Sequence, residues 1–342
     1  MKYRNLGRTG LKISTICLGS DDFGDGTSAE VAEKIICRSV DAGINLIDTG
    51  NLYAGGESEK IIGNTLKLNK LRNNVIISTK VDHAPRKKGV SLDKYIPELP
   101  PNVQGNSRLN IIRACELSLK SLKTDHIDLL QVHRYYPEYH IEETLGAFTD
   151  LVRQGKVRYA GCSTFPPYIL MKAIMLSEMK QYVRFVCEES PYNLLDRRLE
   201  NELVPLALEH GIGILAWSPL AHGMLVGLYK NAKDYPKSSR AGARGSFYSE
   251  RITDNGIRIG KRFIDLSKKI GLSPAQLGVL WCKDQPGITG VLVGTKKIKH
   301  LEDLVKVSEM NLDEEIRNLC DKLVSPGSFV ANFYNTSGWM KG

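Results

Sequence analysis

The chain of 342 residues lacks the features that mark membrane and secreted proteins. No apolar run approaches the roughly 20 residues that a helix needs to span a bilayer. The charged start at residues 1–5 is not followed by an apolar segment, so no secretory signal is visible. We therefore expect a cytoplasmic protein with no membrane partner.

Cysteine is scarce, because only seven cysteines are scattered along the chain and no two form a C-x-x-C pair. This spacing favours packed thiols over a zinc site or a disulfide framework, so no metal is expected. The net charge of +9 is spread along the chain, and we expect no nucleic-acid partner. A solvated basic surface is one interpretation, and attraction of a polyanionic cofactor or a phosphorylated substrate is the other.

Nucleotide-binding signatures are missing as well, since no G-x-G-x-x-G follows an apolar run and no P-loop occurs. A doubly wound nucleotide-binding sheet is therefore disfavoured. What the chain does contain is eight short apolar runs that alternate with segments of helical period, and eight parallel strands are the number that closes a barrel. The runs occupy residues 16–19, 44–48, 75–80, 127–133, 157–161, 185–188, 212–218 and 289–294.

These runs are apolar throughout, as in strands buried on both faces. We predict an α/β fold, a single (β/α)8 TIM barrel over residues 1–342. Residues 3–6 and 11–13 flank a glycine-containing turn and predict an N-terminal β-hairpin. A helix is predicted over 107–123, where Leu109 is one of the residues at helical spacing. The irregular stretches 81–106 and 219–256 are expected to be long loops on the active face.

Polar residues at the ends of the predicted strands are the place to seek chemistry, because barrel active sites are built there. The strands end in Asp48, Lys80 and His133, and Tyr53 follows Asp48 by five residues. Tyrosine, with a pKa of about 10, is a weak acid at neutral pH, but a nearby ammonium lowers that pKa and a carboxylate holds the ammonium in place. The histidine can hydrogen-bond a carbonyl oxygen beside the phenol.

Each of the four residues also has a plain structural interpretation. Asp48 and Lys80 could form a buried ion pair, His133 could be a satisfied histidine and Tyr53 an ordinary loop aromatic. The coincidence of all four at neighbouring strand ends favours a proton-donating site.

The segments around these residues resemble the aldo-keto reductase family. The matching segments follow in family-like order, from the first hairpin to about residue 310. They are IDTxxxY at 47–53, STK at 78–80, LKTDHIDLLQVHR at 122–134, GCSTF at 161–165, PYNLLDR at 191–197 and AWSPLA at 216–221. The resemblance implies that Asp48, Tyr53, Lys80 and His133 are a catalytic tetrad with Tyr53 as general acid.

The same resemblance implies a nicotinamide cofactor, NADP(H), with NAD(H) left open. It places Ser163 and Thr164 at the carboxamide, Tyr192 against the nicotinamide ring and Lys296 at the 2′-phosphate. A surface lysine at a helix start is the alternative for Lys296. The remaining implied cofactor residues are Ser20, Glu189, Trp217, Ser218, Pro219, Leu220, Gly223, Leu225, Gly294 and His300.

Departures from the family pattern affect both the cofactor and the substrate. Glu189 replaces the usual glutamine, and an ionised glutamate can accept from the carboxamide NH2 but cannot donate to its oxygen. We expect such a charge to favour the oxidised cofactor. His300 stands where relatives carry other residues around the adenosine, which leaves the preference for NADP open. Asp21 and Asp22 follow Ser20, and carboxylates there suggest a hydroxylated, sugar-like or cationic substrate, with solvated loop aspartates as the alternative.

We therefore expect reversible, NAD(P)H-dependent reduction of an aldehyde or ketone, with a small-molecule carbonyl or alcohol as the partner and Tyr136 as a further candidate in its pocket. The first alternative is a cofactor-binding regulatory or sensor subunit, as in the potassium-channel beta subunits of the family. A barrel enzyme of unrelated chemistry, such as a phosphate-binding isomerase, is the second. The substrate and the oligomeric state stay open.

Overall fold

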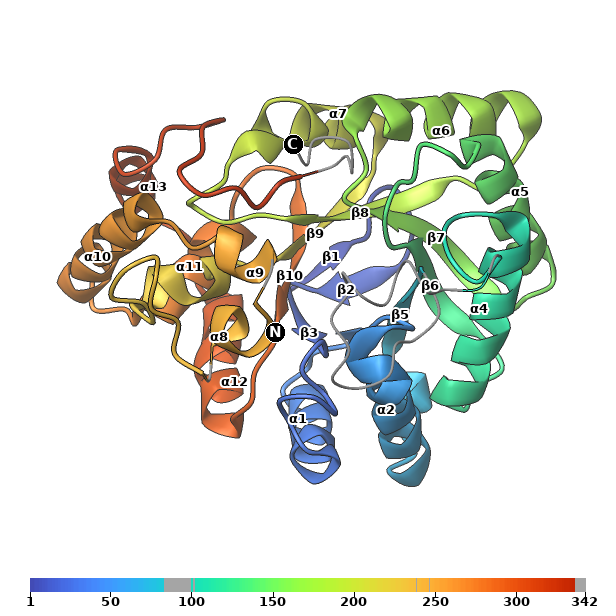
Figure 1. Ribbon diagram of the computed structural model, residues 1–342, viewed down its shortest axis with the longest axis horizontal. Helices are drawn as coiled ribbons and strands as arrows, with labels where there is room; N and C mark the ends of the chain where they lie inside the picture. Colours follow the sequence, from blue (N-terminus) through green and yellow to red (C-terminus); the bar gives the residue numbers. More distant parts are fainter. Residues whose placement is uncertain (83–99, 101, 238, 246, 336–342) are drawn as a thin grey trace.

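Eight parallel strands form a closed barrel in the order β10-β3-β4-β5-β6-β7-β8-β9 (Figure 1). The computed structural model describes residues 1–82, 100, 102–237, 239–245 and 247–335. The predicted (β/α)8 fold is confirmed. The barrel strands are β3 (Ile16–Gly19), β4 (Leu46–Asp48), β5 (Ile76–Val81), β6 (Ile127–Val132), β7 (Val157–Ser163), β8 (Phe185–Pro191), β9 (Gly213–Trp217) and β10 (Ile288–Val293).

Helices surround the strands in chain order, from blue at the bottom of Figure 1 through green to orange. Local capping fixes several of their starts; Ser107, for example, accepts a hydrogen bond from the backbone of Asn110 at the start of α4. The helices of the ring are α1 (Ala29–Asp41), α2 (Glu57–Leu68), α4 (Arg108–Leu122), α5 (Ile141–Arg153), α6 (Pro167–Lys180), α7 (Leu203–His210), α10 (Asp254–Lys269), α11 (Pro274–Lys283) and α12 (Ile298–Val305), and α13 (Glu314–Asp321) follows them.

The eight predicted apolar runs coincide with the eight barrel strands, and the helix predicted over 107–123 is α4. Leu109, however, is 60% exposed and does not belong to the buried face of α4. The stretch 219–256 is less irregular than expected, because it contains a 3-10 helix (Ala221–Val226) and the short helices α8 (Arg240–Arg244) and α9 (Phe247–Glu250). Most of the loop expected over 81–106 lies outside the described residues.

The predicted hairpin, β1 (Tyr3–Asn5) and β2 (Lys12–Ser14), closes one end of the barrel. Leu6 and Ile13, both fully buried, join one apolar cluster with side chains from inside the barrel, including Leu46, Leu129 and Leu215. A separate and larger cluster lies between the strands and the helices. The hairpin therefore closes the interior of the barrel at the N-terminal ends of the strands.

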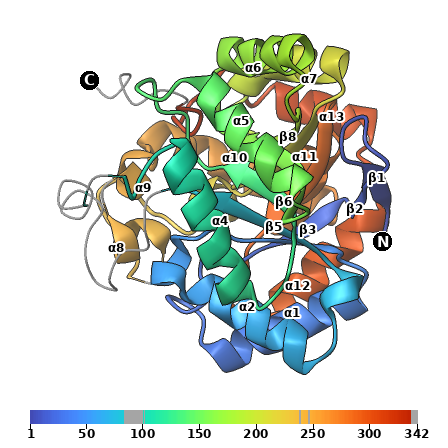
Figure 2. The same cartoon turned by 90° about the vertical axis from the view of Figure 1, so that its right-hand side faces the viewer.

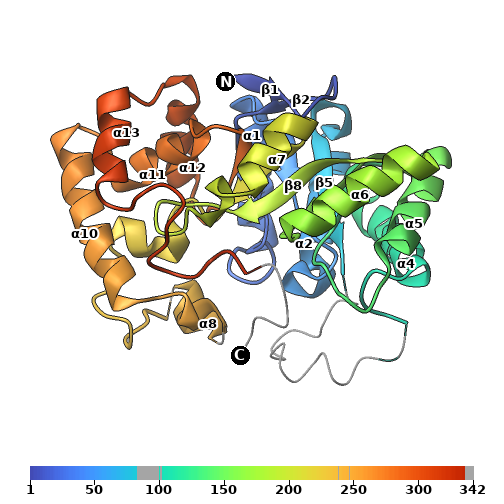
Figure 3. The same ribbon diagram turned by 90° about the horizontal axis from the view of Figure 1, so that it is seen from above.

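The opposite end of the barrel carries the loops that follow the strands. Figures 2 and 3 show the hairpin at one end and α8 at the other. Because all eight strands are parallel, their C-terminal ends share the face on which α8 lies, and catalytic residues of such barrels gather on that face. Within the described part of the chain, no helix is long and apolar enough to cross a membrane.

We predict that Leu6→Ala lowers the free energy of unfolding by about 2–5 kcal/mol, because it opens a cavity under the barrel. Leu68→Ala, at a position that is 73% exposed on α2, is the control and should change it by less than about 0.5 kcal/mol. Urea denaturation followed by circular dichroism measures both. Equal stability of the two variants would show that the hairpin is not part of the core.

Candidate active site

The Lys80 ammonium is buried at the end of β5, with 1% of its side chain exposed. Its nitrogen lies 2.5 Å from Asp48 Oδ2, 3.0 Å from the carbonyl oxygen of Thr49 and 3.1 Å from Glu189 Oε1. An ammonium carries three hydrogens, and three acceptors surround this one. The charge is thus fully compensated, as a buried cation requires.

Tyr53 begins the 3-10 helix after β4 (Tyr53–Gly56) and lies over the lysine. Lys80 Nζ is 5.3 Å from the centroid of the Tyr53 ring, and the His133 ring packs edge-on against that ring at 5.9 Å. The structure therefore brings Asp48, Tyr53, Lys80 and His133 together at one point of the barrel mouth.

The acidity of Tyr53 differs from the simple expectation that an ammonium lowers its pKa. Burial raises the pKa of the Tyr53 phenol, and this effect exceeds the opposing effect of Lys80. The carboxylates of Asp48 and Glu189 raise the pKa further. The lysine acts in the expected direction but is outweighed.

His133 is held by an acid that the sequence did not single out. Its Nδ1 lies 3.2 Å from Asp82 Oδ2, two residues beyond Lys80, although the two atoms are not aligned for a hydrogen bond. Tyr136 donates to the other oxygen of Asp82 at 2.7 Å. Burial lowers the pKa of His133, against the influence of Asp82, so the imidazole is neutral at neutral pH and carries one N–H donor.

Glu189 points into the barrel and has partners that were not expected for it. Oε1 faces Lys80, and Oε2 accepts from Gln131 Nε2 at 2.7 Å. Gln131 Nε2 also donates to Ser78 Oγ at 2.9 Å, and Ser78 Oγ donates to Asp48 Oδ1 at 2.8 Å. The contacts form a closed ring from Glu189 through Gln131, Ser78, Asp48 and Lys80.

Ser163 and Thr164 lie at the end of β7, beside the backbone of Glu189. The Ser163 hydroxyl donates to the Glu189 carbonyl at 2.8 Å, which leaves its lone pairs free to accept. Thr164 has a left-handed backbone with φ of 52°. Ser20 is fully buried and donates to the Asp48 carbonyl at 2.8 Å, so it connects β3 to β4.

Tyr192, which was expected to stack on the nicotinamide ring, is buried within the protein. It is 1% exposed, its ring is stacked on Trp281 with centroids 5.2 Å apart, and its hydroxyl donates to Glu200 at 2.6 Å. Trp217, at the end of β9, is half-buried and lies within the strand-end layer. The geometry favours Trp217 over Tyr192 for an aromatic contact with a ligand.

The segment after β9 turns tightly at four left-handed residues. Ser218, Ala221, His222 and Gly223 have φ of 57°, 49°, 53° and 103°. Pro219 and Leu225 are buried and Leu220 is half-buried. Successive backbone turns of this kind form concavities in which N–H groups can bind anions.

Asp21 and Asp22 have basic partners from the loop after β9. Arg244 donates to Asp21 Oδ2 at 2.7 Å and lies 3.2 Å from Asp22 Oδ1, and Arg240 lies 3.1 Å from Asp21 Oδ2. These pairs hold α8 against the segment after β3. The negative charge expected to select a hydroxylated, sugar-like or cationic substrate is thus compensated within the protein.

Basic and polar residues after β10 lie beside this contact. Gly294 and Lys296 are exposed in the β10–α12 turn, and His300 is exposed in the first turn of α12. A Cβ atom on Gly294 would be 3.8 Å from a guanidinium nitrogen of Arg240, and one on Gly26 would be 2.7 Å from Lys296 Nζ. Lys296 and Arg240 therefore both reach the β3–β10 edge of the mouth.

Sequence reasoning missed Asp82, Gln131, Arg240 and Arg244. The first two follow the alternation of buried strands, since Asp82 is two residues after Lys80 and Gln131 two before His133. The two arginines lie in a long loop with no fixed sequence pattern. They are four residues apart and follow Ser239, the N-cap of α8, and only this spacing indicated a common helix face.

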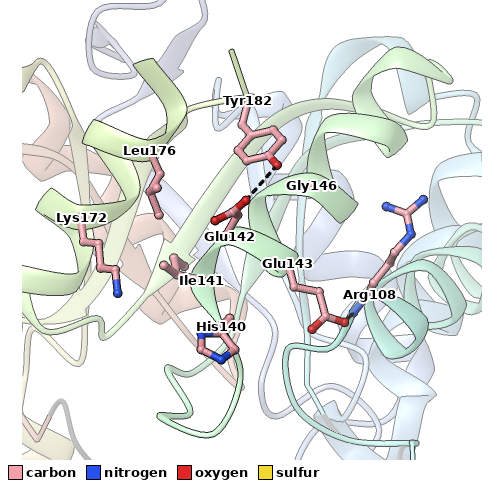
Figure 4. A pocket seen from close by; sticks show the side chains of 9 residues that line it. All are labelled: Arg108, His140, Ile141, Glu142, Glu143, Gly146, Lys172, Leu176 and Tyr182. Atoms are coloured by element: carbon pink, nitrogen blue, oxygen red, sulfur yellow. Dashed lines mark hydrogen bonds between the residues drawn. The ribbon is translucent and has the colours of Figure 1, made fainter. Parts of the chain in front are cut away.

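A cavity of about 480 Å³ lies outside the barrel, between α4, α5 and α6 (Figure 4). Its lining includes Arg108, Glu142, Lys172 and Tyr182, and none of the predicted site residues. Among the described residues no group of histidine, cysteine, aspartate and glutamate side chains could hold a metal ion.

The sequence matches the model of a known protein family. The model of the Aldo/keto reductase family matches residues 15–325. The chain belongs to this family. It is 36% identical to an uncharacterised oxidoreductase, YrpG, of Bacillus subtilis, over 98% of this chain and 99% of the relative. It is 31% identical to an aldo-keto reductase of Fusarium vanettenii, with 95% and 91% covered.

A third relative carries a different description. A probable voltage-gated potassium channel subunit beta of Arabidopsis thaliana is 30% identical, over 91% of this chain and 92% of the relative. Membership of the family supports an oxidoreductase activity.

Glu188, the residue before Glu189, faces the other side of β8. Its raised pKa leads us to predict that the stability of the fold depends on pH. Its carboxyl accepts from Ser190 at 2.6 Å, and burial raises its pKa from 4.5 to about 8. The folded protein therefore holds a proton that the unfolded chain releases, so this group stabilises the fold below pH 4.5 and its contribution is lost as the pH rises through about 8.

We predict that Glu188→Gln flattens the fall of the free energy of unfolding between about pH 5 and pH 8, a slope of at most about 1.4 kcal/mol per pH unit. Glu209→Gln, an exposed carboxylate on α7, is the control and should leave the slope as it is. Chemical denaturation at several pH values measures the slopes. An unchanged slope in Glu188→Gln would mean that this carboxyl does not take up the proton.

Proposed function

We propose that the protein is an NADPH-dependent reductase of aldehydes or ketones, acting reversibly. The observation that carries the proposal is the buried Lys80 ammonium, held by Asp48 at 2.5 Å and lying 5.3 Å from the Tyr53 ring. In a family that supports oxidoreductase activity, this arrangement suits protonation of a carbonyl oxygen.

In the proposed reaction a bound nicotinamide supplies the hydride to the carbonyl carbon. Tyr53 donates its proton to the carbonyl oxygen, and the neutral His133 donates a hydrogen bond to the same oxygen. Lys80 stabilises the negative charge that develops on Tyr53, and Asp48 orients Lys80. Asp82 positions His133 and, through its second oxygen, also holds Tyr136.

The residues at the mouth fit a dinucleotide phosphate. The left-handed turns at 218–223 suit a pyrophosphate, and the exposed Lys296 and His300, with Arg240 beside Gly294, suit the adenosine phosphate. Ser163 and Thr164 would hold the carboxamide, and Trp217 would contact the ring. Several basic groups at this edge favour NADP(H) over NAD(H).

A cofactor-binding regulatory subunit is the second candidate, because the probable potassium channel subunit beta of Arabidopsis thaliana resembles nearly the whole chain. The tetrad geometry is compatible with both candidates. Turnover of a carbonyl panel with NADPH favours the enzyme, whereas NADPH binding without turnover favours the subunit.

We predict that Tyr53→Phe lowers kcat/KM for the reduction of a nitro-substituted benzaldehyde by at least about 10²-fold, because general acid catalysis contributes roughly 10²–10⁴-fold. The Kd for NADPH, measured by its fluorescence, should change by less than about threefold, since the phenol is not needed to hold the cofactor. Tyr168→Phe, which removes the hydroxyl of an exposed tyrosine on α6, is the control and should leave kcat/KM unchanged. Near-normal turnover by Tyr53→Phe would remove Tyr53 from the acid role.

We predict that NADPH binds more tightly than NADH and that Lys296→Ala reduces this preference about tenfold or more, because a charge-assisted contact with phosphate contributes about 1.5–3 kcal/mol. Lys297→Ala, at the neighbouring exposed lysine, is the control. Fluorescence titration with both cofactors gives the four dissociation constants. Equal affinities of the unmodified protein for NADPH and NADH would contradict the phosphate assignment.

A further inference from the structure

Glu189 is one of two carboxylates that share the buried Lys80 ammonium. Lys80 Nζ lies 2.5 Å from Asp48 Oδ2 and 3.1 Å from Glu189 Oε1, and the Thr49 carbonyl takes the remaining hydrogen at 3.0 Å. Both carboxylate side chains are 3% exposed. No hydrogen of the ammonium is left for the Tyr53 oxygen while Glu189 keeps this position.

The hydrogen bonds around Glu189 select its ionised form. One oxygen faces an ammonium and the other accepts from the Gln131 amide at 2.7 Å. Neither neighbour can accept a hydrogen from a protonated carboxyl, because an ammonium and an amide NH2 are only donors. Burial and Asp48 nevertheless raise the pKa of Glu189 by more than Lys80 and Gln131 lower it, so its net pKa is above the ordinary value and full ionisation needs alkaline pH.

Space for this arrangement is provided by β7. A Cβ atom on Gly161 would lie 3.1 Å from Gln131 Cγ and 2.6 Å from Cys187 Sγ. A larger residue there would displace the glutamine that holds Glu189. The glycine on β7 therefore leaves room for the closed ring of contacts, which consists of Glu189, Gln131, Ser78, Asp48 and Lys80.

We propose that Glu189 is a positioning residue, a second counter-ion that draws Lys80 away from Tyr53 and so strengthens the hold of Tyr53 on its proton. This role rests on the proposed reductase function. It differs from a contact with the carboxamide of the cofactor, which was the expectation from the sequence.

The consequence for the reaction concerns its pH range. A phenol that keeps its proton at higher pH remains a competent donor for reduction, whereas alcohol oxidation needs the tyrosinate as base. Glu189 thus extends reduction towards alkaline pH at the expense of oxidation. Since Tyr53 ionises at alkaline pH, Glu189 is ionised where this effect is measured.

The groups that influence this titration come from every neighbouring element. Facing Tyr53 are Lys80, Asp48, Glu189 and Asp21, together with the His133 ring that packs against it. Facing Glu189 are Asp48 on β4, Lys80 on β5, Gln131 on β6, Cys187 on β8 and Cys17 on β3. Replacing Glu189 alone leaves the other groups unchanged.

The test is the ionisation of Tyr53 in Glu189→Gln, which keeps the shape of the side chain and removes its charge. Tyrosinate absorbance is followed from neutral pH to the highest pH at which the protein stays folded, and the same curve for Tyr53→Phe is subtracted. We expect ionisation to begin about one pH unit lower than in the unmodified protein, so the tyrosinate fraction at a given pH rises about tenfold. The alkaline limb of kcat/KM for reduction of a nitro-substituted benzaldehyde should move by the same amount.

Two controls separate charge from structure. Glu189→Asp keeps the charge and should stay near the unmodified curve, and Glu188→Gln removes a buried carboxyl on the opposite side of β8 and should not shift it. Glu189→Met removes the charge as well and replaces Glu189→Gln if that variant does not fold.

Identical Tyr53 curves for the unmodified protein and for the charge-removing variant would overturn the proposal. So would a changed ratio of the dissociation constants of NADP⁺ and NADPH without a shift of Tyr53, which would assign Glu189 to the carboxamide. The absorbance titration needs neither cofactor nor turnover. Its result therefore stands apart from a failure to find any reduced carbonyl, which would count against the proposed function alone.

Discussion

The structure of the barrel mouth depends on burying one ammonium ion. Lys80 has almost no contact with solvent, and such a charge is tolerated only when acceptors replace the lost water. Asp48 and the Thr49 carbonyl supply them from the end of β4 and Glu189 supplies one from β8, and Gln131 and Ser78 orient the two carboxylates. These polar contacts thereby join the ends of β4, β5, β6 and β8.

Removing Lys80 or Asp48 from this ring would leave a buried charge without its main partner. A buried ion pair that loses one partner typically costs about 3–5 kcal/mol, more than an isolated surface pair contributes. The same interactions that suit Lys80 to its chemistry are thus part of the stability of the mouth. Tyr53 and His133 pack against the ring from above, where they remain open to a substrate.

Much of this could be predicted from the sequence. The eight strands are apolar on both faces, so their number and order were readable, and Asp48, Lys80 and His133 are strand-end residues whose positions follow from strand length. Glu189 was noticed as an unusual residue, but its contacts with Lys80 and Gln131 were not predicted, because a sequence does not say which way a strand-end side chain turns. Tyr192 was misplaced for a related reason, since its ring could turn towards the mouth or towards Trp281.

The loops escaped prediction altogether. Arg240 and Arg244 meet Asp21 and Asp22 across more than 200 positions of sequence, and no local pattern connects them. An expectation about substrate charge built on the two aspartates alone therefore left out the two arginines that compensate them. Contacts of this kind follow from the closed barrel, which brings β10 beside β3.

The hairpin at the other end of the barrel determines how ligands can enter and leave. Because Leu6 and Ile13 fill the end of the barrel on the hairpin side, a small molecule can approach Lys80 only from the opposite face. Whatever reaches the lysine must pass the loops that follow the strands, and it must return by the same route. Of two molecules bound at this site together, the one nearer to Lys80 has to arrive first and depart last.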